Sequence, residues 1–449
     1  MDYSSHDISH YNETNNSAMQ GKQNKTKKIS CKNHRVNMAI LGDNLISLDL
    51  LNKYYAHQKE ALDIDMIYID PPYNVGVNYG YNNTWKGESR KFFGCDWIGS
   101  HGSFLDFMEP RLKIGHHLLA EHGVMFVSIC DKEYPYLKIV MDKIFDAKNN
   151  LGTIIWNKTG GSASYHLNTV HEYILVYAKN IEKAPSLQKY KKGSQQIIQK
   201  ANEIKKSGLN YIKAQSIFKE WIHNQKKKLY ISPGEAEYKY LHPETFRPFR
   251  VTASCAQDRS ESRCHLKLRH PVTAKACLTP SKGWKWSKAT LLEMYKHTKY
   301  YIGDGFVLAG KICYGKDENS VPGKIKYLDE DLSHKLPTII NLSPPKNKDL
   351  PPNVIFSTPK PVALIKELIR SLPNKNISVL DYFAGSGTTA QAVYELNKED
   401  NGNRSWILIE EVKNTFQKVL LKRLEHIDPS SDYRIYEFHA DTSALMNKI

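Results

Sequence analysis

Two parts of the chain alternate short apolar runs with longer amphipathic segments. In the first part the apolar runs, each of which predicts a buried strand, lie at 38–41, 66–69, 124–129, 153–156 and 172–178. Residues 45–51 and 104–120 carry apolar side chains at helical spacing between them. Strands that are apolar along their whole length are buried on both faces. The pattern therefore predicts an α/β fold, with a parallel sheet covered by helices on both faces.

The same alternation returns near residue 353. Apolar runs lie at 354–356, 377–380 and 406–409, and the last two are predicted strands. A helix is predicted over 362–372, and a second one runs to residue 396. The stretch between the two parts, 179–335, lacks this alternation apart from helical spacing over 211–222, so we interpret it as an inserted domain.

The charge distribution sharpens this division. The chain has 63 Lys and Arg against 47 Asp and Glu, a net charge of +16. Residues 179–288 hold 24 of the basic and 8 of the acidic residues, so the remaining 339 residues are balanced. A positive excess confined to the insert predicts a polyanionic partner for that part of the chain. Residues 1–35 are rich in Asn, Ser and Lys without apolar periodicity, which predicts a mobile polar tail.

Composition excludes several classes of protein. With 41% hydrophobic residues, 27 Tyr, 14 Phe and 7 Trp, the chain is not disordered throughout. No apolar run approaches the roughly 20 residues that cross a bilayer, and the N-terminal region lacks the apolar stretch of a secretory signal, so we expect no membrane partner. The seven cysteines are scattered without a C-x-x-C pair. We therefore expect reduced thiols, no metal site and a cytoplasmic location.

A glycine-containing turn follows the predicted strand at 377–380. Gly385 and Gly387 suit a tight turn between a strand and a helix. Asp381 and Glu410 end two successive strands, where α/β folds bind ligands and where a carboxylate can hold ribose hydroxyls. The segment lacks the third glycine of a dinucleotide motif and the Lys-Ser/Thr pair of a P-loop. It therefore favours a nucleoside cofactor without phosphates.

The tetrad Asp70-Pro71-Pro72-Tyr73 follows the predicted strand at 66–69. The two prolines remove backbone donors and stiffen the turn. The Asp70 carboxylate and the Pro71 carbonyl remain as fixed acceptors, which match an NH2 group, and the Tyr73 ring can stack on the base that carries it. For an isolated Asp-Pro-Pro, a capped turn without catalytic function is the alternative.

The chain resembles the amino-DNA methyltransferases of the permuted beta class, in particular the modification subunits of type III restriction systems. The residues that carry the resemblance lie at 70–74, 108–112, 127–131, 172–177, 283–287, 358–361 and 380–390. The resemblance implies a circularly permuted, Rossmann-like class I methyltransferase fold. In it, 36–178 is the catalytic half, 336–449 the cofactor-binding half, and 179–335 the target-recognition insert.

The resemblance also implies methyl transfer from S-adenosylmethionine to the exocyclic amine of adenine in DNA. Asp70 and the Pro71 carbonyl would accept hydrogen bonds from the amine, and Tyr73 would stack on a base flipped out of the duplex. The expected cofactor-binding residues are Asp381, Phe383, Ala384, Gly385, Gly387, Thr388, Glu410 and Lys360.

Two of these assignments have alternatives, and a third segment, Asp43-Asn44, has two interpretations. Glu411 is a possible substitute for Glu410 at the ribose. Lys360 belongs to the segment that closes over the cofactor carboxylate in the family, or else is a solvated lysine before a helix. Asp43-Asn44 either approaches the same cleft or caps the helix over 45–51.

Double-stranded DNA is the partner that the resemblance implies for the insert. The expected DNA-binding residues are Arg247, Arg250, Arg259, Arg263, Lys267, Arg269 and Lys285. Arginine can read guanine edges and lysine mostly holds phosphates. At least one of Trp284 and Trp286 is expected in a core. A homodimer and a restriction nuclease subunit are further partners suggested by the family.

Three other functions remain as alternatives. Cytosine-amine methylation usually goes with Ser in place of Asp70, and methylation of RNA or of a protein glutamine often uses Asn there. A catalytically inactive DNA-binding specificity subunit would not need Asp70, Tyr73, Gly385 and Gly387, all of which are present.

Overall fold

The computed structural model describes residues 37–57, 63–74, 90–92, 95–97, 100–158, 167–228, 230–255, 264–344, 350–429 and 433–437. The tail expected over 1–35 lies outside these ranges. The chain divides into two compact units, of which the second is Tyr190–His334 and the first contains the rest. It passes between the units in β8 (Gln188–Tyr190) and β15 (Ser333–Lys335), which pair as a two-stranded sheet.

The first unit contains a nine-stranded sheet in the order β16-β6-β7-β5-β2-β17-β18-β1-β19. Its strands are β1 (Asn37–Leu41), β2 (Ile64–Ile69), β5 (Leu119–Ile129), β6 (Asn150–Asn157), β7 (His171–Ala178), β16 (Ile339–Asn341), β17 (Ser378–Asp381), β18 (Ser405–Glu410) and β19 (Tyr433–Glu437). The expected strands are present, but the sheet is mixed instead of parallel, because β7 runs antiparallel to both β5 and β6. The helix α3 carries the chain back so that β6 runs in the direction of β5, and β7, which follows β6 without a crossover helix, runs antiparallel to both.

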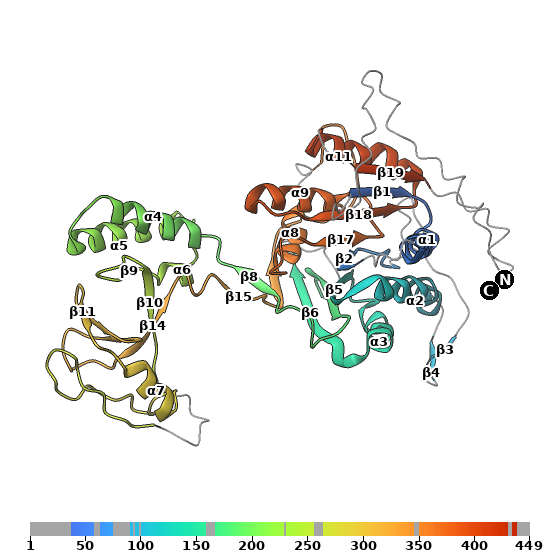
Figure 1. Cartoon of the computed structure of the whole chain (residues 1–449). Helices are drawn as coiled ribbons and strands as arrows, with labels where there is room; N and C mark the ends of the chain where they lie inside the picture. Colours follow the sequence, from blue (N-terminus) through green and yellow to red (C-terminus); the bar gives the residue numbers. More distant parts are fainter. Residues whose placement is uncertain are drawn as a thin grey trace, which may run out of the picture. The chain divides into compact units, whose positions relative to one another are not determined.

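Helices cover both faces of this sheet (Figure 1). One face packs against α1 (Asn44–His57), α2 (Ser100–Leu118) and α3 (Tyr134–Phe145). The other packs against α8 (Val362–Arg370), α9 (Thr388–Asp400) and α11 (Leu421–Ile427). The short elements before α11 are α10 (Lys413–Thr415) and a π-helical turn (Phe416–Leu420). A separate hairpin pairs β3 (Arg90–Phe92) with β4 (Cys95–Trp97).

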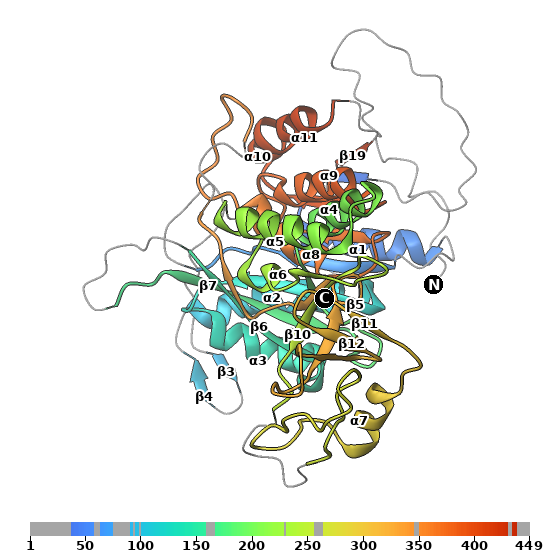
Figure 2. The ribbon, with the colours of Figure 1, turned by 90° about the vertical axis from the view of Figure 1, so that its left-hand side faces the viewer.

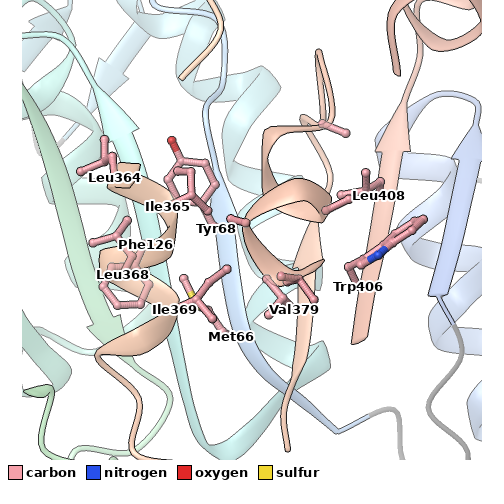
Figure 3. Packing of buried hydrophobic residues seen from close by; sticks show 14 of the residues in the cluster. Met66, Tyr68, Phe126, Leu364, Ile365, Leu368, Ile369, Val379, Trp406 and Leu408 are labelled. Carbon is pink, nitrogen blue, oxygen red and sulfur yellow. The ribbon is translucent and has the colours of Figure 1, made fainter. Parts of the chain in front are cut away.

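The packing of α8 shows why its sequence forms this layer (Figure 3). Leu364, Ile365 and Leu368 are fully buried and lie in one cluster with Met66 and Val379 of the sheet. Burial of each such side chain stabilises the fold by roughly 1.5–3 kcal/mol. By contrast, the apolar run at 354–356 forms neither helix nor strand.

The second unit joins helices to a small antiparallel sheet. The helices α4 (Ser194–Lys206) and α5 (Tyr211–Lys227) lie side by side (Figure 2), with the shorter α6 (Pro233–Ala236) and α7 (Lys288–Tyr295) elsewhere in the unit. The sheet has the order β11-β12-β13-β14-β10-β9. Its strands are β9 (Tyr240–Leu241), β10 (Pro248–Thr252), β11 (Tyr300–Ile302), β12 (Val307–Ala309), β13 (Ile312–Tyr314) and β14 (Gly323–Tyr327). None of the described helices in either unit has the length and apolar character needed to span a bilayer.

Candidate active site

The tetrad and the glycine turn, which are more than 300 residues apart in the chain, contribute to one pocket. It lies where β2, β17 and β18 end, and these strands are parallel neighbours. The empty space in and above the pocket amounts to about 910 Å3, which includes open solvent. The predicted residues that line it are Asp70, Pro72, Lys360, Asp381, Phe383, Ala384, Gly385, Thr388 and Glu410. Asn44 and Glu411, the alternatives considered above, line it as well.

The glycine turn adopts a backbone that favours glycine. Gly385 has φ +51° and Gly387 has φ +77°, both in the left-handed region. A Cβ at Gly385 would also lie 3.3 Å from the Phe356 ring, so even alanine would crowd that side chain. Behind the turn, the fully buried Arg423 donates to the Thr388 hydroxyl at 3.0 Å. The turn is therefore held from inside the fold.

Asp381 and Glu410 brace this turn with their carboxylates. Asp381 accepts hydrogen bonds from the Phe383 N–H at 3.1 Å and from the Thr389 hydroxyl at 2.5 Å. Glu410 accepts from the Gly385 N–H and the Val412 N–H, both at 2.9 Å. Burial raises the pKa of Asp381 to about 7 and that of Glu410 to about 7. Glu410 is the less buried of the two.

The Asp70–Tyr73 tetrad contributes two side chains to a compact charged cluster. The Tyr73 hydroxyl lies 2.7 Å from Asp70 Oδ1 and 3.0 Å from Glu172 Oε2 on β7. Lys360 Nζ lies 2.8 Å from Asp70 Oδ1 and 3.0 Å from Glu172 Oε2, and it donates to the Tyr73 oxygen at 2.8 Å. Lys158 pairs with the other oxygen of Glu172 at 2.9 Å. Lys360 thus contacts two residues of the tetrad and also lines the pocket.

The charged groups in this cluster shift one another's pKa values. Burial raises the pKa of Asp70, and the Lys360 ammonium acts in the opposite direction. Burial also acts to raise the pKa of Glu172, but the ammonium groups of Lys360 and Lys158 outweigh it and lower the pKa to about 2. The pKa of Lys360 is raised although burial opposes this, because two carboxylates surround the ammonium. Lys360 and Glu172 therefore remain charged at neutral pH.

The loop after β5 fixes the end of the tetrad. Cys130 Sγ lies 3.6 Å from the Tyr73 carbonyl oxygen, and Lys132 Nζ donates to the Asn74 carbonyl at 2.7 Å. The Asn74 side chain donates to the buried Glu133 carboxylate at 2.8 Å. Asn74 itself has φ +53°, a conformation that asparagine tolerates better than most residues. Sequence reasoning assigned no role to Glu133 or Glu172, although Glu172 lies in one of the segments that carry the resemblance.

Both interpretations of Asp43-Asn44 hold. Asp43 Oδ1 accepts from the Ile46 N–H at 2.9 Å, which caps α1. Asn44 lines the pocket, donates to the Tyr382 carbonyl at 3.1 Å and accepts from Arg111 Nε at 2.5 Å. Arg111, which lies in the segment 108–112 but was not predicted as a site residue, also lies 3.3 Å from Asp43.

The expected DNA-binding residues differ in their surroundings within the second unit. Arg247 pairs with Asp329 and Glu330 at 2.8 and 2.7 Å, and Arg250 pairs with Asp331 at 3.3 Å. The residues with exposed side chains are Lys267, Arg269 and Lys285. Arg259 and Arg263 lie outside the described residues.

The two tryptophans of the insert also differ. Trp284 is buried and donates to the Leu266 carbonyl at 2.8 Å, so it belongs to a core as expected of at least one of the pair. Trp286 is partly buried and packs against the same hydrophobic cluster.

Curated relatives match most of this chain. It is 28% identical over 83% of its length to the EcoP15I Mod subunit of a type III restriction-modification enzyme from Escherichia coli. It is 28% identical over 82% of its length to the type II methyltransferase M.KpnI from Klebsiella pneumoniae. It is 29% identical over 83% of its length to the StyLTI Mod subunit from Salmonella typhimurium. The chain spans 58% of the EcoP15I subunit, 79% of M.KpnI and 52% of the StyLTI subunit.

A family model described as DNA methylase, for N6 and N4 methyltransferases, matches residues 64–420. That range includes the tetrad, the whole second unit, Lys360, the glycine turn and Glu410. In the structure, the strand that precedes the tetrad, β2, comes before the strand that precedes the glycine turn, β17, and the two lie side by side in the sheet. Because the matched range covers more than half of the sequence, this chain belongs to the N6/N4 DNA methylase family.

Proposed function

We propose that this chain is a DNA methyltransferase that transfers a methyl group from S-adenosylmethionine to the exocyclic amine of adenine. The observation that carries the proposal is the shared pocket. Asp70 and Pro72 of the tetrad line the same cavity as the glycine turn and Glu410. An amine acceptor and a nucleoside site within one cavity are what methyl transfer between two bound substrates requires.

The residues of the pocket fit this cofactor. The left-handed turn at Gly385 brings backbone to the pocket wall without a side chain in the way. The carboxylates of Glu410 and Glu411 can accept hydrogen bonds from ribose hydroxyls, and Phe383 offers an apolar ring on the same wall. When bound, S-adenosylmethionine supplies an electrophilic methyl group on a sulfonium centre.

The tetrad supplies orientation and electrostatics. The Asp70 carboxylate and the Pro71 carbonyl would accept the two hydrogens of the adenine amine. The nitrogen lone pair is delocalised into the ring, and holding both hydrogens favours the pyramidal nitrogen that can attack. Tyr73 would stack on the base, which must leave the duplex because a stacked and paired base cannot reach the pocket.

The partners in this proposal follow from the names of the relatives and from charge. The basic second unit would hold double-stranded DNA, because its positive excess suits a phosphate backbone. Two of the relatives are Mod subunits of restriction-modification enzymes, so we include in the proposal a modification role, a homodimer and a nuclease subunit. We also propose a cytoplasmic location, in keeping with the scattered cysteines of the chain.

The proposal is tested by expressing the chain in a host that lacks DNA methylation and by sequencing modified bases in its DNA. We expect N6-methyladenine at one recurring site. Asp70→Ala should lower the rate at least about 100-fold while cofactor binding persists, because it removes a preorganised acceptor. A folded, cofactor-binding protein that leaves no modified adenine contradicts the proposal, and modified cytosine would favour the alternative function.

A further inference from the structure

Lys360 stands where the proposed mechanism puts the target amine. Its ammonium donates to Asp70 Oδ1, the atom that would accept from the base, at 2.8 Å. It also lies 3.0 Å from Glu172 Oε2 and 2.8 Å from the Tyr73 oxygen, and its side chain is only 10% exposed. An ammonium and an exocyclic amine are both nitrogen donors with several hydrogens. The Lys360 ammonium therefore occupies the position at Asp70 that the proposed mechanism assigns to the adenine amine.

The local sequence fixes the position of this lysine. Pro359 and Pro361 flank Lys360 and restrict the backbone on both sides of it. Pro361 is the N-cap of α8, which is anchored in the core of the first unit. The Lys360 ammonium also lies 4.8 Å from the centre of the Tyr73 ring, a distance typical of a cation–π contact. A solvated lysine would make none of these contacts.

The charged groups around Asp70 indicate what Lys360 does for this carboxylate. The groups that face Asp70 are Lys360, Glu172 on β7, Tyr73, Tyr68 on β2 and Asp381 on β17. Lys360 is the one cation among the described residues that pairs with Asp70, whereas Glu172 also pairs with Lys158. A buried carboxylate beside a second carboxylate tends to take up a proton, and a protonated acid is a poor acceptor for an amine.

We propose that Lys360 is a positioning residue that keeps Asp70 charged and aligned, and that it transfers to Glu172 when the target amine takes its place. The inference rests on the proposed function. Lys360 Nζ already contacts Glu172, so the exchange gives up the contact with Asp70 and leaves the ammonium paired throughout. The base amine then donates to an Asp70 carboxylate that is already ionised.

The pH dependence of methylation tests this role. In the wild type, the rate should fall at low pH as Asp70 takes up a proton. Lys360→Met should move this acidic limb to higher pH by about one unit or more, because an opposite charge at such a distance lowers a carboxyl pKa by about that much. Lys360→Arg keeps the charge and should leave the limb near its wild-type position.

A matched control separates this effect from general loss of charge. Lys158→Met also removes an ammonium from the cluster, but Lys158 pairs with Glu172 and not with Asp70. It should move the limb much less than Lys360→Met does. Affinity for S-adenosylmethionine is measured in parallel, and Lys158→Met should leave it unchanged, because Lys158 does not line the pocket.

Two results would overturn the inference. One is an acidic limb that Lys360→Met leaves in place. The other is a loss of cofactor affinity with the limb unmoved, which would assign Lys360 to the cofactor carboxylate instead.

If Lys360→Met has no measurable rate, the Asp70 carboxyl can be titrated by 13C NMR, with Asp70→Asn to assign its signal. A midpoint equal to that of the wild type then refutes the role. A wild-type protein without activity refutes the proposed function itself, and the NMR titration separates the two failures.

Discussion

At the residue scale, Asp381 shows how a carboxylate can serve a fold at a cost in stability. Its side chain is 3% exposed, and both oxygens are used within the glycine turn. Burial raises the pKa of Asp381 to about 7, from an ordinary value of 3.8. The folded state therefore holds this proton more tightly than the unfolded state, and stability is lost as pH rises from about 4 to about 7.

Asp381→Asn should remove this pH dependence. The amide oxygen can still accept from Phe383 N–H, and the amide NH2 can donate to the Thr389 hydroxyl, which rotates to accept. The variant should gain stability over the wild type by a few kcal/mol at pH 8, since one pKa unit corresponds to about 1.4 kcal/mol. At pH 4 the gain should vanish. Denaturant unfolding at both values measures the difference, and a pH-independent difference would contradict the assignment.

The same scale shows what the sequence could predict of the site. Asp70 and Tyr73, like Gly385 and Gly387, stand in short motifs whose chemistry can be inferred from neighbouring residues. The cluster of Tyr73 with Glu172 and Lys360 joins side chains 99 and 287 residues apart, and no local pattern reports it. Lys360 was therefore assigned to the cofactor by resemblance alone, while the structure adds its contacts with Asp70 and Glu172.

At the element scale, the second unit contains a turn that occurs twice. In His242–Phe246 and His270–Ala274, the imidazole Nδ1 lies 3.2–3.3 Å from the N–H groups two and three residues later. In both, the N–H of the fifth residue donates to the histidine carbonyl at 2.9 Å. Both fifth residues, Phe246 and Ala274, have positive φ, at +63° and +59°. The apolar pattern of the sequence does not report this repeat, because the two turns share only three residues, His, Pro and Thr, and no apolar period.

This turn gives a prediction about stability. Ala274 is exposed and adopts a left-handed conformation that costs an L-residue about 1–2 kcal/mol. Ala274→Gly should therefore raise the free energy of unfolding by up to about 1 kcal/mol, because glycine avoids the strain at some cost in entropy. Val272→Gly, at a neighbouring position without positive φ, should lower it by a similar amount. Thermal unfolding of both variants decides, and equal shifts would refute the conformational argument.

At the scale of the whole molecule, alternating apolar runs predicted the layers but not the order of the sheet. The strand β1 lies between β18 and β19, and β2 lies beside β17, so the two ends of the chain build one sheet. Such pairing is set by the packing of whole layers and leaves no local signature. The short strands of the second unit, most of three to five residues, show too little alternation to be predicted.

Net charge also belongs to the scale of the whole molecule. In the second unit, the structure separates basic residues that pair with carboxylates from basic residues that do not. Acidic residues at 329–331 pair with Arg247, Arg250, Lys191 and Lys326, which partly cancels their attraction for a polyanion. Lys267 and Lys285 are exposed instead, and no described carboxylate pairs with either of them. If the second unit holds DNA, these two lysines should contact phosphates.

Replacing both lysines by Gln should reduce the salt dependence of DNA binding. Each phosphate contact adds about 0.9 to the slope of log K against log salt, so Lys267→Gln with Lys285→Gln should lower the slope by about 2. Lys299→Gln provides the control, because Lys299 is exposed but already pairs with Glu244 at 3.3 Å. Fluorescence anisotropy with a labelled duplex at several salt concentrations measures all three slopes. A double variant with the slope of the control would mean that DNA is held elsewhere, since exposed charge contributes to the slope only where it displaces counterions from the backbone.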